Sequence, residues 1–255
     1  MCTKRSIKDY YKIELNQIFD KREDIITGQL SDINPYYGDL YFSRHDGLDE
    51  SEYVFIDGND LKNRIRDVEG LHIGETGFGT GLNFLTLLKI IEESGITGMR
   101  LKYSSIEKYP LDPTRIQELL SPFADRLSEL LPKYLSYWES FYPTLNKEWN
   151  NVTWSFPGVE VDFKLYNGDA LTWSSEKSEA HVNAWFLDGH SPDKNPEIWS
   201  PGIMKSVYEN TAIGGTLASF TASGMVKRAL REAGFFIKRK KGFGAKRHMI
   251  QGLKS

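Results

Sequence analysis

The stretch that decides the fold is Gly74-Glu75-Thr76-Gly77-Phe78-Gly79-Thr80-Gly81-Leu82-Asn83. A short apolar run, residues 71–73, precedes it and an apolar-periodic run, residues 84–91, follows it, so we expect a strand, a glycine-rich turn and a helix. Glycine has no Cβ, which lets the backbone turn sharply and come close to a ligand. A helix that begins after such a turn presents free N–H groups and a positive potential. The stretch therefore predicts a ligand site in an α/β fold, with a purely structural turn as the alternative.

The spacing of the glycines narrows the class of ligand. Dinucleotide-binding folds use G-x-G-x-x-G. Here Gly77, Gly79 and Gly81 follow G-x-G-x-G, and Leu82 stands where the third glycine of that fingerprint would be. The Gly-Lys-Ser/Thr of a phosphate-binding loop is also absent from this turn. A strand followed by Glu-x-G-x-G-x-G instead resembles the first motif of class I methyltransferases, which implies S-adenosylmethionine as the cofactor.

Composition excludes several other classes of protein. Hydrophobic and charged residues make up 40% and 26% of the 255 residues, as in ordinary globular proteins. No apolar run approaches the ~20 residues that span a membrane, and no apolar stretch follows the basic N-terminus, so neither a membrane partner nor a signal peptide is expected. The single cysteine, Cys2, permits no internal disulfide and favours a cytoplasmic location. The five histidines are scattered, so no metal site is expected.

The net charge of −3 conceals a basic C-terminal part. From Gly224 onward there are ten Lys and Arg and one acidic residue, whereas residues 1–223 are net acidic. Such a block can bind nucleic-acid phosphates, or it can be the solvated face of a helix and two strands. The candidate RNA-binding cations are Lys238, Arg239, Lys240, Lys241, Lys246 and Arg247.

From residue 71 onward, predicted strands alternate with helices. This alternation favours a parallel sheet covered on both faces, with strands near residues 71–75, 101–106, 161–166, 184–188 and 215–220. The last two apolar runs, residues 235–240 and 248–253, are joined by a glycine-containing loop and predict an antiparallel hairpin at the sheet edge. We therefore predict an α/β, Rossmann-like class I methyltransferase fold over residues 67–255, with a seven-stranded sheet that ends in this hairpin.

One segment precedes the alternation and another interrupts it. Residues 1–66 predict an N-terminal extension with a β-hairpin, whose strands are residues 40–43 and 52–56 around an Asp-Gly turn. Residues 109–158 carry apolar residues at spacings of three and four, which predict a helical insertion. Six aromatic residues lie between Tyr134 and Trp149, and their helical period favours a place in the core over a base-stacking surface.

Acidic residues close four of the predicted strands, at the edge where open α/β sheets bind their ligands. Glu75 closes the first, where its carboxylate would lie near the amino-acid moiety of the cofactor. Glu107 closes the second and can accept hydrogen bonds from both ribose hydroxyls, or pair with Lys108. Asp169 follows the third and can accept the adenine amine, or cap the next helix.

Asp188 closes the fourth strand, at the corner where class I methyltransferases react. A carboxylate there could orient the lone pair of an attacking amine, and alignment supplies much of the rate of a displacement. It could also take the proton of the amine, although its charge favours the ammonium form. His190 could assist or could be an ordinary loop residue. Residues 191–199 are expected to form a loop that closes over the site.

These motifs together resemble the methyltransferase module of the MnmC family of bacterial tRNA-modifying proteins. The resemblance runs in order from about residue 35 to residue 253 and is carried above all by Gly74–Leu85, Ser105–Leu111, Ala184–Gly189, Gly214–Thr221 and Lys240–Gly244. It implies that S-adenosylmethionine methylates the aminomethyl group of a wobble uridine in tRNA. The product would be 5-methylaminomethyl(-2-thio)uridine.

The resemblance also implies roles for individual residues. It places Asp188 beside the methyl group and the target amine, and His190 and the six basic residues on the RNA. Roles in binding the cofactor are expected for Glu75, Gly77, Gly79, Gly81, Asn83, Glu107, Lys108, Asp169, Ala170 and Asp188.

Two departures from the family pattern bear on the function. The larger members carry a C-terminal FAD-dependent oxidase, which would begin where this sequence ends, so neither FAD nor oxidase activity is expected and a separate oxidase is a candidate partner. The segment His190-Ser191-Pro192 replaces the usual aromatic-Ala-Pro. The alternatives are therefore a methyltransferase for another RNA nucleoside or a small amine, and a non-catalytic RNA module that binds S-adenosylmethionine.

Overall fold

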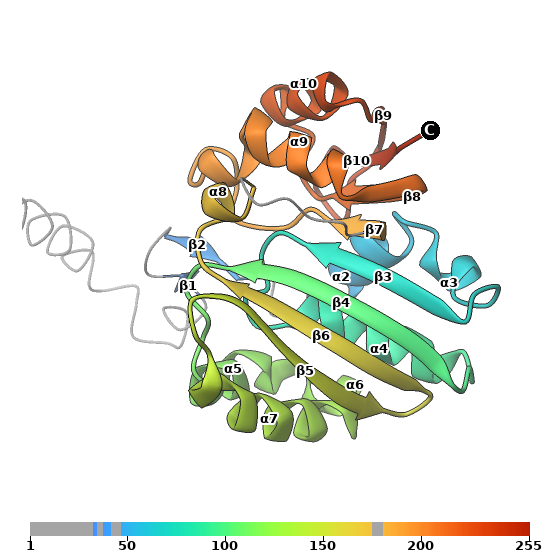
Figure 1. Ribbon diagram of the computed structural model, residues 1–255, viewed down its shortest axis with the longest axis vertical. Helices are drawn as coiled ribbons and strands as arrows, with labels where there is room; N and C mark the ends of the chain where they lie inside the picture. Colours follow the sequence, from blue (N-terminus) through green and yellow to red (C-terminus); the bar gives the residue numbers. More distant parts are fainter. Residues whose placement is uncertain (1–32, 35–37, 42–46, 175–180) are drawn as a thin grey trace, which may run out of the picture.

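A computed structural model describes residues 33–34, 38–41, 47–174 and 181–255. Its centre is a sheet of eight strands in the order β5-β6-β4-β3-β7-β8-β10-β9 (Figure 1). Five neighbouring strands run parallel, namely β3 (Gly70–Glu75), β4 (Met99–Glu107), β6 (Val159–Asn167), β7 (Val182–Phe186) and β8 (Thr211–Ser219). Antiparallel strands flank them, namely β5 (Glu148–Phe156) on one side and β10 (His248–Leu253) with β9 (Phe236–Lys241) on the other.

Helices cover both faces of this sheet (Figure 1). One face carries α4 (Leu82–Glu93) and the group α5 (Pro113–Leu120), α6 (Ala124–Leu127) and α7 (Leu130–Phe141), with single turns η3 (Ser121–Phe123) and η4 (Tyr142–Thr144). The other carries α8 (Ala170–Trp173), η5 (Glu197–Trp199), α9 (Pro201–Glu209) and α10 (Gly224–Ala233). The predicted class I methyltransferase architecture, including the antiparallel C-terminal hairpin, is confirmed.

The prediction of seven strands was wrong, since the described part of the chain has eight in the main sheet. The additional strand, β5, lies inside the predicted helical insertion of residues 109–158, which is helical only as far as Thr144. Along β5, Asn150, Trp154 and Phe156 are buried and Val152 is half-buried, while the residues that alternate with them, 151, 153 and 155, are exposed. A turn at residues 157–158 then returns the chain into β6. Side chains that alternate with period two before a Pro-Gly turn indicate a hairpin. This pattern marks the end of the helical part of the insertion.

The predicted strand at residues 52–56 was also wrong. The chain is helical there, in α2 (Gly47–Ser51), the π-helical turn η2 (Glu52–Ile56) and α3 (Leu61–Arg64). Val54, Phe55 and Ile56 are consecutive and all buried. In a strand with one exposed face, consecutive side chains would alternate between the core and the solvent. The described hairpin is shorter and earlier, between β1 (Ile33–Asn34) and β2 (Asp39–Leu40), and residues 42–46 lie outside the described residues.

Most of the aromatic residues named between Tyr134 and Trp149 lie in the core, as predicted. Tyr134, Trp138 and Phe141 are buried in the apolar cluster that contains α4, so these aromatics form core, whereas Trp149 is exposed. Among the described residues no helix is both long and apolar enough to cross a membrane. The boundary predicted at residue 66 stays a prediction; Leu48 and Leu61, which precede it, pack into the same apolar cluster.

Candidate active site

The glycine-rich turn connects β3 to α4 and packs against the end of β7. A Cβ on Gly77 would lie 3.3 Å from the Cα of Gly189. Gly81 precedes α4 as its N-cap with φ 79°, and a Cβ there would lie 2.6 Å from the hydroxyl oxygen of Tyr134. Gly79 also has a positive φ, 53°, but a Cβ added there would have no neighbour closer than 3.8 Å. The turn thus needs glycine for conformation and close packing, and it is open at Gly79.

Glu75 lies beneath the turn and is fully buried. Its Oε1 accepts a hydrogen bond from Nδ2 of Asn83 at 3.0 Å, and its Oε2 accepts one from the hydroxyl of Ser105 at 2.8 Å. Burial and the nearby carboxylate of Asp188 raise the pKa of Glu75 well above its usual range. The side chain presents no surface to a ligand, so Glu75 acts on the site through the groups that it contacts.

Asp188 follows β7 and is only partly buried. Its Oδ2 accepts a hydrogen bond from Nδ2 of Asn83 at 2.7 Å, and its Oδ1 accepts one from the backbone N–H of Gly189 at 2.8 Å. Burial raises the pKa of Asp188 to about 6, although these two hydrogen bonds oppose the shift. A carboxyl group with a pKa near neutrality at the end of a parallel strand is suited to proton transfer.

Glu107 is the last residue of β4, and its side chain accepts a hydrogen bond from the glycine turn. Its Oε2 accepts the backbone N–H of Gly79 and its Oε1 accepts that of Tyr109, both at 2.9 Å. Burial raises the pKa of Glu107 above its usual value. Each carboxylate oxygen has two lone pairs, so Glu107 keeps the capacity to accept further hydrogen bonds.

Lys108 and Asp169 join the ends of β4 and β6. The ammonium of Lys108 lies 2.7 Å from Oδ2 of Asp169. The other oxygen of Asp169 accepts the backbone N–H of Leu171 at 2.9 Å, so this residue caps α8, which begins at the buried Ala170. Although partial burial raises the pKa of Asp169, these hydrogen bonds lower it below its usual value overall. The helix-capping alternative for Asp169 is therefore present in the structure.

His190 lies in the loop after β7. Its ring packs edge-on against Tyr41, with ring centroids 6.3 Å apart. Its backbone oxygen accepts a hydrogen bond from Nε1 of Trp199 at 2.9 Å, and Trp199 is fully buried. The far end of the loop is thus anchored in the core.

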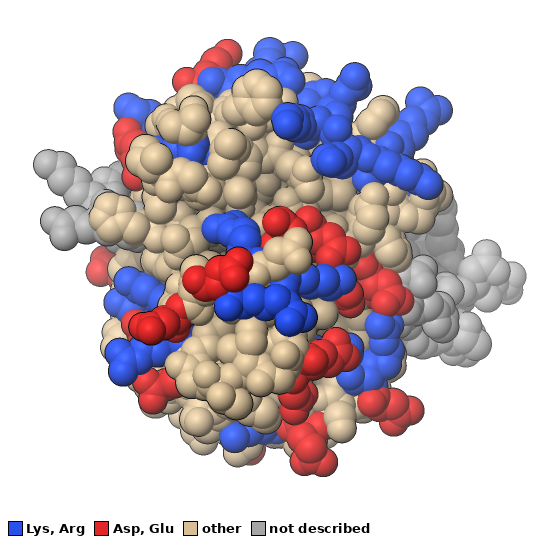
Figure 2. Space-filling view, turned by 90° about the vertical axis from the view of Figure 1, so that its right-hand side faces the viewer, with Lys and Arg blue, Asp and Glu red and all other residues tan. Residues whose placement is uncertain are grey.

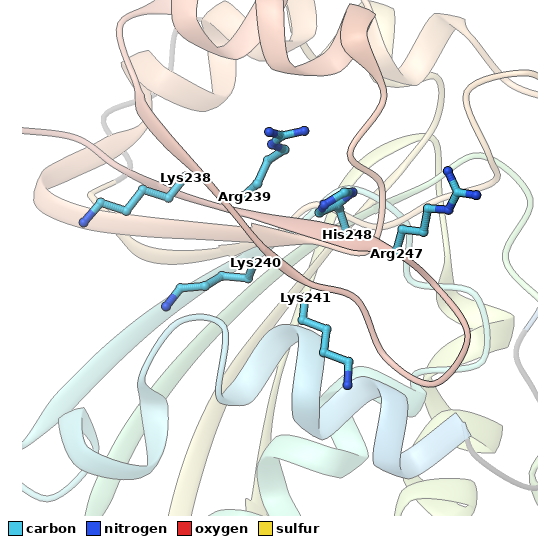
Figure 3. A pocket seen from close by; sticks show the side chains of 6 residues that line it. All are labelled: Lys238, Arg239, Lys240, Lys241, Arg247 and His248. Carbon is cyan, nitrogen blue, oxygen red and sulfur yellow. The ribbon is translucent and has the colours of Figure 1, made fainter.

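The predicted basic residues divide into two groups. Figure 2 shows Lys and Arg gathered on the upper part of one face, and Figure 3 shows most of the predicted residues around a shallow pocket on β9 and β10. The pocket is lined by His248 and by five cations, which we call the basic surface: Lys238, Arg239, Lys240, Lys241 and Arg247. Lys246 is separate: its ammonium pairs with Glu50 of α2 and lies 5.1 Å from the centre of the Phe220 ring.

Sequence reasoning missed the hydroxyl groups of the site. Ser51 donates to Asn83 at 2.7 Å, Ser105 donates to Glu75, and Thr76 donates to the backbone oxygen of Asp188 at 2.7 Å. Thr76 and Ser105 lie in motifs that were already recognised, so their position was a usable signal. No such signal was available for Ser51, because its segment was expected to form part of a hairpin. Among the described residues, no group of three or more His, Cys, Asp or Glu could hold a metal ion.

Comparisons with known proteins give the class of the chain. Residues 132–255 match the model of a family described as S-adenosyl-L-methionine-dependent methyltransferase. The chain is 41% identical over 222 residues to the tRNA 5-methylaminomethyl-2-thiouridine biosynthesis bifunctional protein MnmC of Pseudomonas aeruginosa strain UCBPP-PA14, covering 85% of this chain and 32% of that protein. The identity to the protein of the same name from Nitrosospira multiformis is 38% over 226 residues, covering 85% of this chain and 34% of that one.

A crystal structure of MNMC2 from Aquifex aeolicus superposes with a TM-score of 0.63 at 21% identity, over 97% of this chain and 84% of that one. The fold, the glycine turn and the family model define the chain as an S-adenosylmethionine-dependent methyltransferase of class I. Its particular relatives are the MnmC proteins, which confirms the resemblance predicted from the motifs. The chain spans about a third of the length of the curated relatives that it matches.

Proposed function

We propose that this chain methylates the aminomethyl nitrogen of a wobble uridine in tRNA, giving 5-methylaminomethyl(-2-thio)uridine. The observation that carries the proposal is Asp188: a carboxyl group with a pKa of about 6, held at the end of β7 beside the glycine turn. The names of the relatives, which include tRNA 5-methylaminomethyl-2-thiouridine biosynthesis, supply the substrate class.

The residues at the strand ends fit S-adenosylmethionine. A Cβ would crowd Gly189 at Gly77 and Tyr134 at Gly81, whereas the open side of Gly79 would let the cofactor approach the turn. The N-terminus of α4 would offer backbone N–H groups to the amino-acid moiety. The remaining lone pairs of Glu107 would accept the ribose hydroxyls. Lys108, Asp169 and Ala170 would border the adenine. When bound, the cofactor supplies a methyl group on a positively charged sulfur.

The acceptor amine must be neutral to attack. At neutral pH Asp188 is mostly ionised, since its pKa is about 6, and can accept a hydrogen bond from the amine and then the proton that the nitrogen loses. Asn83 and the N–H of Gly189 hold the two carboxylate oxygens in place. Alignment of this kind, rather than a covalent intermediate, would supply most of the rate.

The basic surface would bind phosphates of the tRNA. Four of its cations lie along β9 and Arg247 directly precedes β10, so together they offer several positive charges to a phosphate backbone. His190 would line the pocket of the acceptor base. A separate enzyme, such as an FAD-dependent oxidase, would supply the aminomethyl group, and a tRNA substrate would place the protein in the cytoplasm.

Nucleoside mass spectrometry tests the proposal. The full chain is incubated with S-adenosylmethionine and tRNA that carries 5-aminomethyl-2-thiouridine, with unmodified tRNA as the control. We expect one methyl group on that nucleoside and none on the control. Absence of methylation of the modified tRNA, with cofactor binding intact, would refute the assignment.

A second candidate is methylation of another RNA nucleoside or a small amine. The segment His190-Ser191-Pro192 favours it, because it departs from the aromatic-Ala-Pro of the family pattern. Methylation of free amines without tRNA would support this candidate. Cofactor binding without any methyl transfer would instead indicate a non-catalytic RNA module.

A further inference from the structure

A line of buried polar side chains connects helix α2 to Asp188. Ser51, the last residue of α2, is only 3% exposed, and its hydroxyl donates to Oδ1 of Asn83 at 2.7 Å. Asn83, in the first turn of α4, is 8% exposed and donates from Nδ2 to both Glu75 and Asp188, at 3.0 and 2.7 Å. One amide group thus contacts two carboxylates and one serine, each from a different element.

The hydroxyl of Ser51 has no local duty that would explain it. Ser51 is the N-cap of η2, yet its side chain makes no capping hydrogen bond. Serine hydroxyls inside helices usually bond to the backbone of the preceding turn. Here the partner is 32 residues away in the sequence. The contact therefore serves the junction between α2 and α4 rather than the helix itself.

The contacts of the Asn83 amide favour one of its two orientations, and the Ser51 hydroxyl complements that orientation. The amide has an accepting oxygen and a donating NH2 group. With the Ser51 hydroxyl on the oxygen, the NH2 group faces Glu75 and Asp188. A flipped amide would turn its oxygen toward the acceptor oxygens of Glu75 and Asp188, whereas the Ser51 hydroxyl can pair with either end of the amide. Ser51 therefore fixes the position of the amide, and the two acidic residues fix which end faces them. Unpaired buried polar groups are costly, so the observed orientation is strongly favoured.

We propose that Ser51 is a positioning residue: through Asn83, its hydroxyl keeps the carboxylate of Asp188 in one orientation for proton transfer. The inference rests on the proposed function, because it assumes that Asp188 meets the acceptor amine. The other groups that act on Asp188 are Glu75 of β3, Tyr103 of β4, Glu50 of α2 and Lys246 of the β9–β10 loop.

Single substitutions at Ser51 test this role. In Ser51→Ala we expect kcat to fall about tenfold, as one lost buried hydrogen bond predicts, with the Kd for S-adenosylmethionine unchanged. The acidic limb of the kcat profile should move to higher pH, because the hydrogen bond from Asn83 lowers the pKa of Asp188. Ser51→Thr keeps the hydroxyl and should retain activity and pH profile. If the alanine variant does not fold, Ser51→Cys keeps the volume with a weaker donor.

Ser206→Ala is the matched control. Ser206 is also a buried helical serine, and its hydroxyl donates to the backbone oxygen of Ser174 at the same distance of 2.7 Å. This variant should lose stability without a change in the pH profile. A double variant, Ser51→Ala with Asn83→Ala, should be no slower than Asn83→Ala alone, since Ser51 acts only through Asn83. Additive losses, or an unmoved acidic limb in Ser51→Ala, would overturn the proposal.

Failure of the proposed function gives a different result. If the wild-type chain does not methylate aminomethyl tRNA, the substrate assignment is wrong, whatever Ser51 does. The carboxyl carbon of Asp188 can then be titrated by NMR in the wild type and in Ser51→Ala, without any substrate. A higher pKa in the variant supports the link through Asn83, and equal pKa values refute it.

Discussion

Replacing Gly81 with alanine should lower the free energy of unfolding by about 3 kcal/mol. Gly81 has a φ of 79°, and a non-glycine residue in this left-handed region costs about 1–2 kcal/mol. The added Cβ would also lie 2.6 Å from the hydroxyl oxygen of Tyr134, which is fully buried and donates to the backbone oxygen of Thr80 at 2.9 Å. Displacing this hydroxyl would leave a buried polar group unpaired, which costs about 1–3 kcal/mol.

Two variants separate these contributions. Tyr134→Phe removes the closest contact, so Gly81→Ala should cost less in that background than in the wild type. Part of the cost should remain, because Cζ of Phe78 lies 2.9 Å and Cζ of residue 134 lies 3.0 Å from the added Cβ. Gly95→Ala is the matched control, because Gly95 has a φ of 69° and nothing within 4 Å of the added Cβ. It should therefore show the backbone cost alone, about 1–2 kcal/mol.

Urea denaturation of the full chain measures the free energies, and titration calorimetry measures binding of S-adenosylmethionine. The Gly81→Ala chain should also bind the cofactor more weakly, because the start of α4 has to shift. The reasoning is refuted if Gly81→Ala costs the same with and without the Tyr134 hydroxyl, or if it costs no more than Gly95→Ala.

Three further predictions concern the chemistry. Asp188→Asn should lower kcat by about 10²–10⁴-fold, the usual contribution of a general base, while calorimetry shows cofactor binding retained; a smaller loss would remove Asp188 from the reaction. In the wild type, kcat should rise as the pH passes through about 6, because Asp188 accepts a proton only when ionised, and a profile flat between pH 5 and pH 7 would contradict this role. Lys240→Gln should weaken tRNA binding and flatten its salt dependence, which fluorescence anisotropy at several salt concentrations measures. The control Lys205→Gln, which changes an exposed lysine on α9, should leave both the affinity and its salt dependence unchanged.

Much of the fold could be predicted because its signals are local. Apolar runs separated by helical patterns predicted all five parallel strands and the C-terminal hairpin. The two errors share one cause. In residues 52–56 and in β5, the local pattern was ambiguous, and burial against distant elements decided between helix and strand.

The sequence by itself determined the glycine turn and the acids that close the strands, because a positive φ and a strand end are properties of short segments. Only the tertiary structure decided what these groups contact. It buried Glu75 against Ser105, paired Lys108 with Asp169, and placed Ser51 against Asn83. Those contacts join residues that are far apart in the chain, and a hydrogen bond between them depends on the packing of α2, α4 and the sheet. No local periodicity encodes that packing.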